Sequence, residues 1–130
     1  MTLKLFISFF ILVIFPINAS AEWIRIFSIA QGDLYINSKS VSRNGNNISF
    51  DQLVDYNKKQ SNGAFSFLTN SEVDCRTLKI RDLNYKLYKQ QMAKGTNFYK
   101  GNPSKKWKNY EPGTSAYLVN KILCERVYKD

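Results

Sequence analysis

Histidine is absent from this 130-residue sequence, and cysteine, proline and acidic residues are scarce. Without histidine the chain lacks the commonest general base and the usual Ser-His-Asp triad, and most zinc and haem sites are excluded. Two cysteines are too few for a zinc site or a dense disulfide framework, but they can form one bridge. The 10 Asp and Glu stand against 19 Lys and Arg, so the net charge is +9. The composition therefore favours an anionic partner over a catalytic or metal centre, and we expect no enzyme activity, metal or cofactor.

The only long apolar run lies at the N-terminus, where residues 1–21 have the pattern of a secretory signal peptide. Lys4 precedes the run Leu5 to Ile17, and Ala19-Ser20-Ala21 is an A-x-A cleavage site. The alternative is a membrane anchor, but the run is shorter than the roughly 20 residues that span a bilayer. We expect cleavage after Ala21. No cysteine adjoins that site, so the exported protein would be periplasmic, released or cell-surface associated, without a lipid anchor and with no later transmembrane segment.

The expected mature chain, 22–130, forms a single domain with a net charge of +8, because cleavage removes only Lys4 (18 basic minus 10 acidic residues). Both Cys75 and Cys124 lie in it, and an oxidising compartment favours a structural disulfide between them. A reactive thiol pair is the alternative, but no C-x-x-C spacing supports redox chemistry.

Alternating apolar and polar residues predict strands over most of the mature chain. We expect strands at 22–29, 34–41, 48–56 and 96–100, a brief pairing at 64–68, and a longer strand at 72–89. Asn44-Gly45 indicates a hairpin turn before the third strand. Within 48–56 we expect an irregularity where Leu53 and Val54 adjoin. Within 72–89 we expect a bulge near Asp82, with a hairpin turn as the alternative.

The last segment predicts a helix that begins at a Thr114 or Ser115 N-cap. Its apolar residues recur at helical spacing: Leu118, Val119, Ile122, Leu123 and Val127. Cys124 lies at the edge of this stripe, within reach of a strand that carries Cys75. The predicted fold class is therefore α+β, a small antiparallel β-sheet with a C-terminal α-helix packed on one face and one disulfide.

The most distinctive feature is an acid-free segment from Leu83 to Tyr110. Clustered lysines attract anionic partners, and exposed aromatic side chains add contact area. The alternative is a solvated face whose aromatic residues turn inward. Alternation along a strand would place Tyr85 and Leu87 in the core and Lys86 outside. The candidate ligand-binding residues are Lys86, Lys89, Lys94, Lys100, Lys105, Lys106, Trp107, Lys108 and Tyr110.

Other function classes are poorly supported. The lysines would give unspecific, salt-sensitive affinity for nucleic acid, and no nucleic-acid-binding motif is present, so we expect no specific nucleic-acid partner. A hydrolase would need two carboxylates that converge in a pocket. The acids to consider are Asp51, Asp55, Glu72, Asp74, Asp82 and Glu111.

Several short motifs resemble the bacterial surface-adhesin protein E family, over nearly the whole mature chain. They are Trp23-Ile24-Arg25, Asp33-Leu34-Tyr35-Ile36, Phe50 to Tyr56, Glu72-Val73-Asp74-Cys75, Leu78-Lys79-Ile80-Arg81, Trp107, Glu111-Pro112-Gly113-Thr114-Ser115 and Leu123-Cys124. The resemblance implies a single α/β domain, a Cys75–Cys124 bridge, dimer formation and binding of host proteins such as laminin and vitronectin. The chain departs from it in two ways: it has no lipid-attachment cysteine, and Phe50 stands where relatives are expected to carry Trp.

Together these observations predict an exported, non-enzymatic, adhesin-like binding module that contacts host matrix or serum proteins, or an anionic surface. The alternative is a periplasmic accessory or structural protein that binds a protein of the producing cell through a sheet edge. A homodimer is one form such edge pairing takes.

Overall fold

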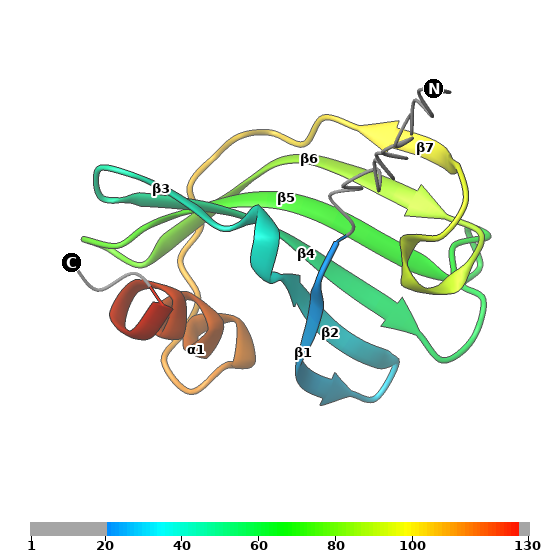
Figure 1. The fold of residues 1–130 in the computed structure, drawn as a ribbon, viewed down its shortest axis with the longest axis horizontal. Coiled ribbons are helices and arrows are strands. Elements are labelled where there is room, and N and C mark those ends of the chain that lie inside the picture. Colours follow the sequence, from blue (N-terminus) through cyan, green and yellow to red (C-terminus); the bar gives the residue numbers. More distant parts are fainter. Residues whose placement is uncertain (1–20, 128–130) are drawn as a thin grey trace, which may run out of the picture.

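A computed structural model describes residues 21–127 as one antiparallel sheet with a short C-terminal helix (Figure 1). The predicted signal peptide, apart from Ala21, lies outside the described residues. Within 21–127 no helix is both long and apolar enough to cross a bilayer. The strands are β1 (Trp23–Ile29), β2 (Gly32–Asn37), β3 (Ser42–Asn44), β4 (Asn47–Tyr56), β5 (Ser66–Asp74), β6 (Lys79–Tyr88) and β7 (Asn97–Gly101).

The strand order is β1-β2-β4-β5-β6-β7, and β3 pairs with β4 beside β2. Neighbouring strands follow each other along the chain, so short turns join most of them. Two 3₁₀ turns interrupt this meander, η1 (Ser38–Ser40) and η2 (Gln91–Ala93). The helix α1 (Ser115–Ile122) continues into a π turn, η3 (Leu123–Val127). β1 and β7 form the two outer edges of the sheet.

The core lies between α1 and one face of the sheet, because alternate strand residues point to that side. Ile48 and Phe50 of β4 are fully buried there, beside their cross-strand neighbour Val73 of β5. From the helix, Val119 and Leu123 complete the cluster. Burying large aliphatic and aromatic side chains in this way stabilises the fold by about 1.5–3 kcal/mol each. Phe50, the departure noted from the family pattern, is therefore a core residue.

The helix begins as predicted, with Thr114 as its N-cap. The Thr114 hydroxyl accepts a hydrogen bond from the Tyr117 N–H at 3.2 Å. The apolar stripe is only partly confirmed, since Leu118 is 44% exposed. The helix is short and lies over one end of the sheet, so only the side that carries Val119 and Leu123 faces the core.

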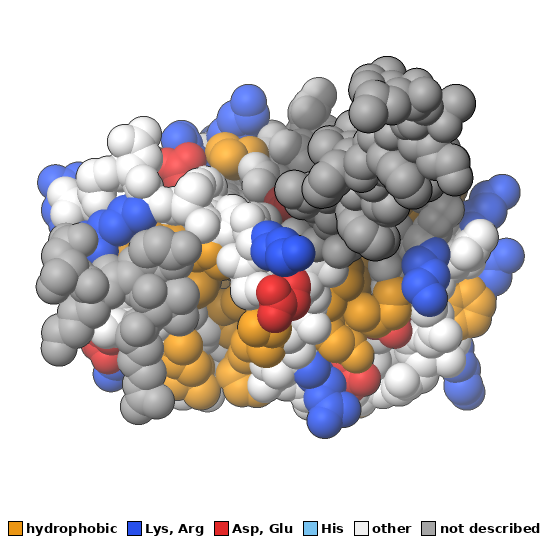
Figure 2. Space-filling model, viewed as in Figure 1, with side chains coloured by type: hydrophobic (Ala, Val, Ile, Leu, Met, Phe, Trp, Pro, Cys, Tyr) orange, Lys and Arg blue, Asp and Glu red, His pale blue; other side chains and the backbone are white. Residues whose placement is uncertain are grey.

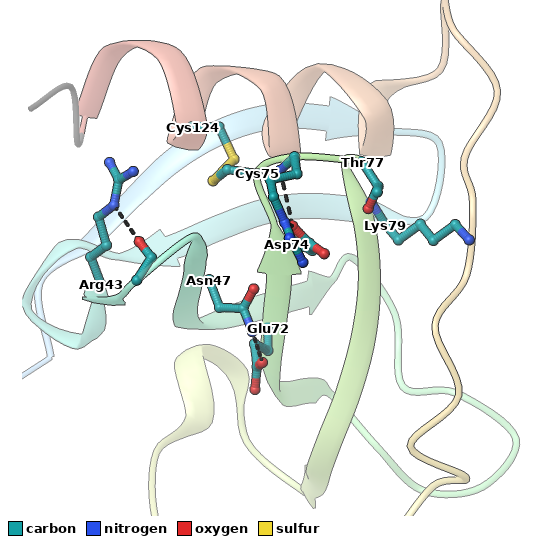
Figure 3. Close-up of polar contacts among 10 residues, drawn as sticks. Arg43, Asn47, Glu72, Asp74, Cys75, Thr77, Lys79 and Cys124 are labelled. Carbon is teal, nitrogen blue, oxygen red and sulfur yellow. Dashed lines mark hydrogen bonds and ion pairs between the residues drawn. A yellow bond between two sulfur atoms is a disulfide. The ribbon is translucent and has the colours of Figure 1, made fainter.

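A disulfide joins Cys75, in the turn after β5, to Cys124, in the π turn after α1, and confirms the predicted bridge (Figure 3). The two Cα atoms are 5.5 Å apart, an ordinary separation for a disulfide. No free cysteine is present in the described part of the chain. The bridge fastens the last helix to the tip of the β5–β6 hairpin.

Three details of the sheet differ from the sequence prediction. The predicted strand 34–41 is divided, because η1 turns the chain between β2 and β3. The predicted strand 72–89 is also divided by a tight turn at 75–78, which is the hairpin alternative. The brief pairing at 64–68 is the beginning of β5, a nine-residue strand.

The predicted bulge is confirmed, while the predicted irregularity in β4 is wrong. Ser71 pairs with Asp82 and Asn70 with Asn84, so Leu83 is the extra residue. In β4 the register continues unbroken through Leu53 and Val54. Leu53 points away from α1 yet is fully buried, because the segment with η2 lies against β4 and β5 on that side. Both faces of β4 therefore accept apolar residues without a break in alternation.

Candidate functional site

The acid-free segment follows the outer side of β6 along its length. β7 pairs antiparallel with the end of β6, where Tyr88 is opposite Asn97. Further along, Lys108 makes a two-hydrogen-bond bridge with Ile80 near the start of β6. Ile80 and Tyr88 are eight residues apart, which corresponds to roughly 26 Å of strand. We call the seven lysines of this edge the basic strip: Lys86, Lys89, Lys94, Lys100, Lys105, Lys106 and Lys108.

At the centre of the strip two lysines lie side by side. Lys86 of β6 is the direct cross-strand partner of Lys100 of β7, so both point to the same face of the sheet. Lys89 lies 5.8 Å from the centre of the Phe98 ring, at the end of β6. Lys94 is exposed in the turn that follows η2.

The other end of the strip is built from the segment that links β7 to α1. Lys105 and Lys106 are exposed there. Trp107 is 38% exposed, and one face of its ring is covered by the Arg81 guanidinium, 4.6 Å from the ring centroid. Lys108 forms an ion pair with Asp82 at 3.5 Å.

Tyr110 has a position different from the rest of the predicted site. It lines a small cavity of about 70 Å³ between α1 and the sheet, together with Gln52 and Asn120. The Asn120 side-chain Nδ2 is buried and has no hydrogen-bond partner. The structure thus arranges the lysines as a line along one edge, and it sets Tyr110 apart at the helix.

The predicted division of β6 into inward and outward residues is only partly seen. Tyr85 and Leu87 do lie on the opposite face from Lys86, but both are half-buried. α1 covers the other end of this face, so Phe67, Tyr85 and Tyr99 form an open row of rings 5.4 and 5.8 Å apart. Tyr99 is 50% exposed. The hydrogen bond with Tyr99 raises the pKa of the Tyr85 hydroxyl, so both stay neutral at physiological pH.

The acids singled out for a hydrolase do not converge. Asp51 accepts a hydrogen bond from Asn70, and Asp55 accepts one from the Met92 N–H. Asp74, at the end of β5, caps the following turn by accepting from the Arg76 N–H at 2.9 Å, and this bond holds its pKa below the ordinary value. The remaining acids lie elsewhere: Glu72 with Arg81, Asp82 with Lys108, and Glu111 before α1. Among residues 21–127 no three His, Cys, Asp or Glu side chains gather to hold a metal.

An apolar groove between β1 and α1 was not foreseen from the sequence. Its volume is about 210 Å³, and its walls are almost wholly aliphatic: Ile24, Ile26, Ile36, Val41, Val119 and Ile122, with Ser38 and Leu123. In Figure 2 hydrophobic side chains gather beside α1 and β1, while most Lys and Arg side chains stand at the outline. The isoleucines of β1 were the available signal, since an edge strand that turns them all inward would need a cover on that side.

Comparison with known proteins places this fold. The model of the family described as surface-adhesin protein E matches residues 23–125. The chain belongs to that family. Membership makes it an adhesin-like surface protein. No sequence match was found among curated proteins.

The adhesin E fold is also seen in solved structures of Haemophilus influenzae protein E. Crystal form II is 19% identical over 84% of this chain and 91% of that chain, with a TM-score of 0.63. The selenomethionine form is 18% identical over 78% of this chain and 86% of that chain, with a TM-score of 0.62. The non-typeable strain's protein is 19% identical over 84% and 79%, with a TM-score of 0.59. At these identities the likeness shows the fold.

Proposed function

We propose that this adhesin E-family protein is exported, has no enzymatic activity, and binds an acidic host protein or an anionic surface through the basic strip. Laminin-like and vitronectin-like proteins are the host candidates that the family suggests. In this proposal Trp107 is an aromatic contact at one end of the strip, and the protein carries no lipid anchor.

The observation that carries the proposal is the pair Lys86 and Lys100. Like charges directly opposite each other on neighbouring strands destabilise a sheet, by roughly 0.2–1 kcal/mol. An acidic side chain or sulfate placed between the two ammonium groups removes that repulsion. In the described part of the chain only Lys108, of the seven strip lysines, has an ion-pair partner. The other six lysines are thus available to a ligand.

The test is charge reversal of three exposed strip lysines, Lys100→Glu, Lys105→Glu and Lys106→Glu together. Lys108 is left unchanged because a glutamate there would face Asp82 and disturb folding. The matched control reverses three exposed lysines away from the strip and changes the net charge equally: Lys39, Lys58 and Lys59.

Binding of residues 22–130 to immobilised laminin and vitronectin is measured at low and physiological salt, with heparin as the polyanion control. We expect the strip variant to lose most binding and the control variant to keep it. Equal binding by both variants would refute the basic strip as the contact surface. Binding to heparin alone, lost at physiological salt, would reduce the strip to general electrostatic attraction.

A second candidate function is supported by the apolar groove. β1 is the sheet's other edge, and Ile24 beside the groove is 47% exposed. An accessory protein of the producing cell, or a second copy, would pair at this edge. Such binding buries apolar surface, so it would persist at high salt and survive reversal of the strip lysines.

A further inference from the structure

The face of the sheet turned away from α1 carries a row of polar side chains beside Trp107. Direct cross-strand pairing places Ser42 opposite Ser49, Ser49 opposite Glu72, and Glu72 opposite Arg81. Because Lys108 bridges Ile80, the preceding Trp107 lies next to Arg81 and covers its guanidinium. We call these five residues the polar row. In Figure 3 Asn47 and Glu72 lie on the side of the sheet away from the helix that carries Cys124.

Hydrogen bonds hold these side chains in fixed positions. Glu72 accepts from Asn47 Nδ2 at 2.8 Å and from Arg81 Nη2 at 3.2 and 3.3 Å. The hydroxyls of Ser42 and Ser49 are 2.9 Å apart. A site whose side chains are already oriented loses little conformational entropy when a ligand binds.

A polar hollow of about 120 Å³ opens beside the row, lined by Asn44, Asn47, Ser49 and Glu72. It has room for about four waters at the roughly 30 Å³ that each occupies in the liquid. An amide offers two donors and one acceptor oxygen, so Asn47 keeps hydrogen-bonding capacity beyond its bond to Glu72. The Nε of Arg81, at the floor of the row, is buried and has no hydrogen-bond partner.

The charge of this face differs from that of the chain as a whole. Glu72 and Arg81 form an ion pair, so the hollow and the row are neutral within a protein of net charge +9. A neutral, hydroxyl-rich ligand matches this surface better than an anion, which would face the Glu72 carboxylate. It also matches better than an apolar peptide, because the hollow has no aliphatic wall.

We propose that the polar row and its hollow bind a neutral saccharide. Sugar hydroxyls both donate and accept, and neighbouring hydroxyls match the planar amide and carboxylate of Asn47 and Glu72. The C–H face of a pyranose ring packs on the exposed part of the Trp107 indole. This proposal goes beyond the lysine-driven binding above and stands independently of it, although Trp107 belongs to both surfaces.

The test uses a panel of neutral trisaccharides from the chito-, malto-, cello- and lacto-series, each added at millimolar concentration to ¹⁵N-labelled protein. At least one member should shift the amide and side-chain signals of Asn47, Ser49, Glu72 and Trp107. With Trp23→Phe as background, indole fluorescence then reports Trp107 alone. No shift with any panel member would overturn the proposal.

Variants separate this site from the basic strip. Asn47→Ala and Ser49→Ala should each weaken binding about tenfold, the equivalent of one lost hydrogen bond. Asn102→Ala, an exposed asparagine in the segment after β7, is the matched control and should bind normally. Two variants of the hollow guard against one that fails to fold, which circular dichroism would reveal.

Salt dependence completes the distinction. Saccharide binding should be unchanged between low and physiological salt and in the Lys100, Lys105 and Lys106 charge-reversal variant. Binding that is restricted to sulfated sugars and lost with salt would overturn the neutral-saccharide proposal and assign the effect to the strip. Saccharide binding without any binding to laminin, vitronectin or heparin would refute only the proposed function.

Discussion

Removing the disulfide should cost this protein a large share of its stability. The change is Cys75→Ala with Cys124→Ala, which leaves no unpaired thiol in the mature chain. The bridge closes a loop of 49 positions. The loop-entropy relation gives about 4 kcal/mol of stabilisation for a loop of that length. Domains of this size have total stabilities of only about 5–15 kcal/mol.

The structure also predicts where the loss appears. α1 has eight residues, and isolated helices shorter than about 12 residues are marginal in water. Besides the bridge, α1 and η3 are held to the sheet mainly by Val119 and Leu123. In the variant we therefore expect the helix to separate before the sheet unfolds, which exposes Ile48 and Phe50.

Urea unfolding followed by tryptophan fluorescence measures the global loss, and amide hydrogen exchange measures the local one. Amides of 115–123 should exchange much faster in the variant, while those of β4 and β5 keep more protection. Leu118→Ala, on the exposed side of the same helix, is the control and should change stability by less than about 0.5 kcal/mol. A loss below about 1 kcal/mol in the double variant would refute the loop-entropy reasoning.

Two further predictions concern backbone contact and pH. A Cβ at Gly32 would lie 1.9 Å from the backbone oxygen of Asp55, so Gly32→Ala must push β2 from β4 and should cost about 1–3 kcal/mol in urea unfolding; a change within about 0.5 kcal/mol would contradict the close approach. The pKa of Asp74 is lowered by the hydrogen bond from the Arg76 N–H, by a smaller contribution from the Arg76 side chain, and by its charge. Its ionised form therefore adds stability above the ordinary value of 3.8, and that stability is lost as the pH falls through the lowered pKa. Asp74→Asn should be less stable than the natural protein at neutral pH and equal to it in strong acid, and a stability difference that does not change with pH would contradict this.

The general architecture could be predicted from local patterns in the sequence. The Thr114 cap, the turn at Asn44-Gly45 and the alternation in β4 each act over a few residues, so the sequence displays them directly. The disulfide followed from export and from having only two cysteines. The strand limits near 37–42 and 75–78 were harder, because a tight turn between polar residues resembles a continuous strand when no Gly or Pro marks it.

The surfaces were much less predictable than the fold, because they depend on which strands become neighbours. The lysine-rich segment was evident, but the side-by-side placement of Lys86 and Lys100 depends on the β6–β7 register. The polar row joins residues from position 42 to position 107, and no local pattern links them. The apolar groove arises where the first strand meets the last helix, two segments at opposite ends of the described chain.

The disulfide has a consequence for a protein that meets proteases outside the cell. The segment 104–113 is exposed, and Lys105, Lys106 and Lys108 are cleavage points for trypsin-like enzymes. All three lie between the bridged Cys75 and Cys124. A single cut there leaves two polypeptides that remain covalently joined, with the cleaved helix still fastened to the hairpin. The basic, protease-sensitive part of this adhesin E-family domain is therefore enclosed within a covalent ring that a nick opens without releasing either piece.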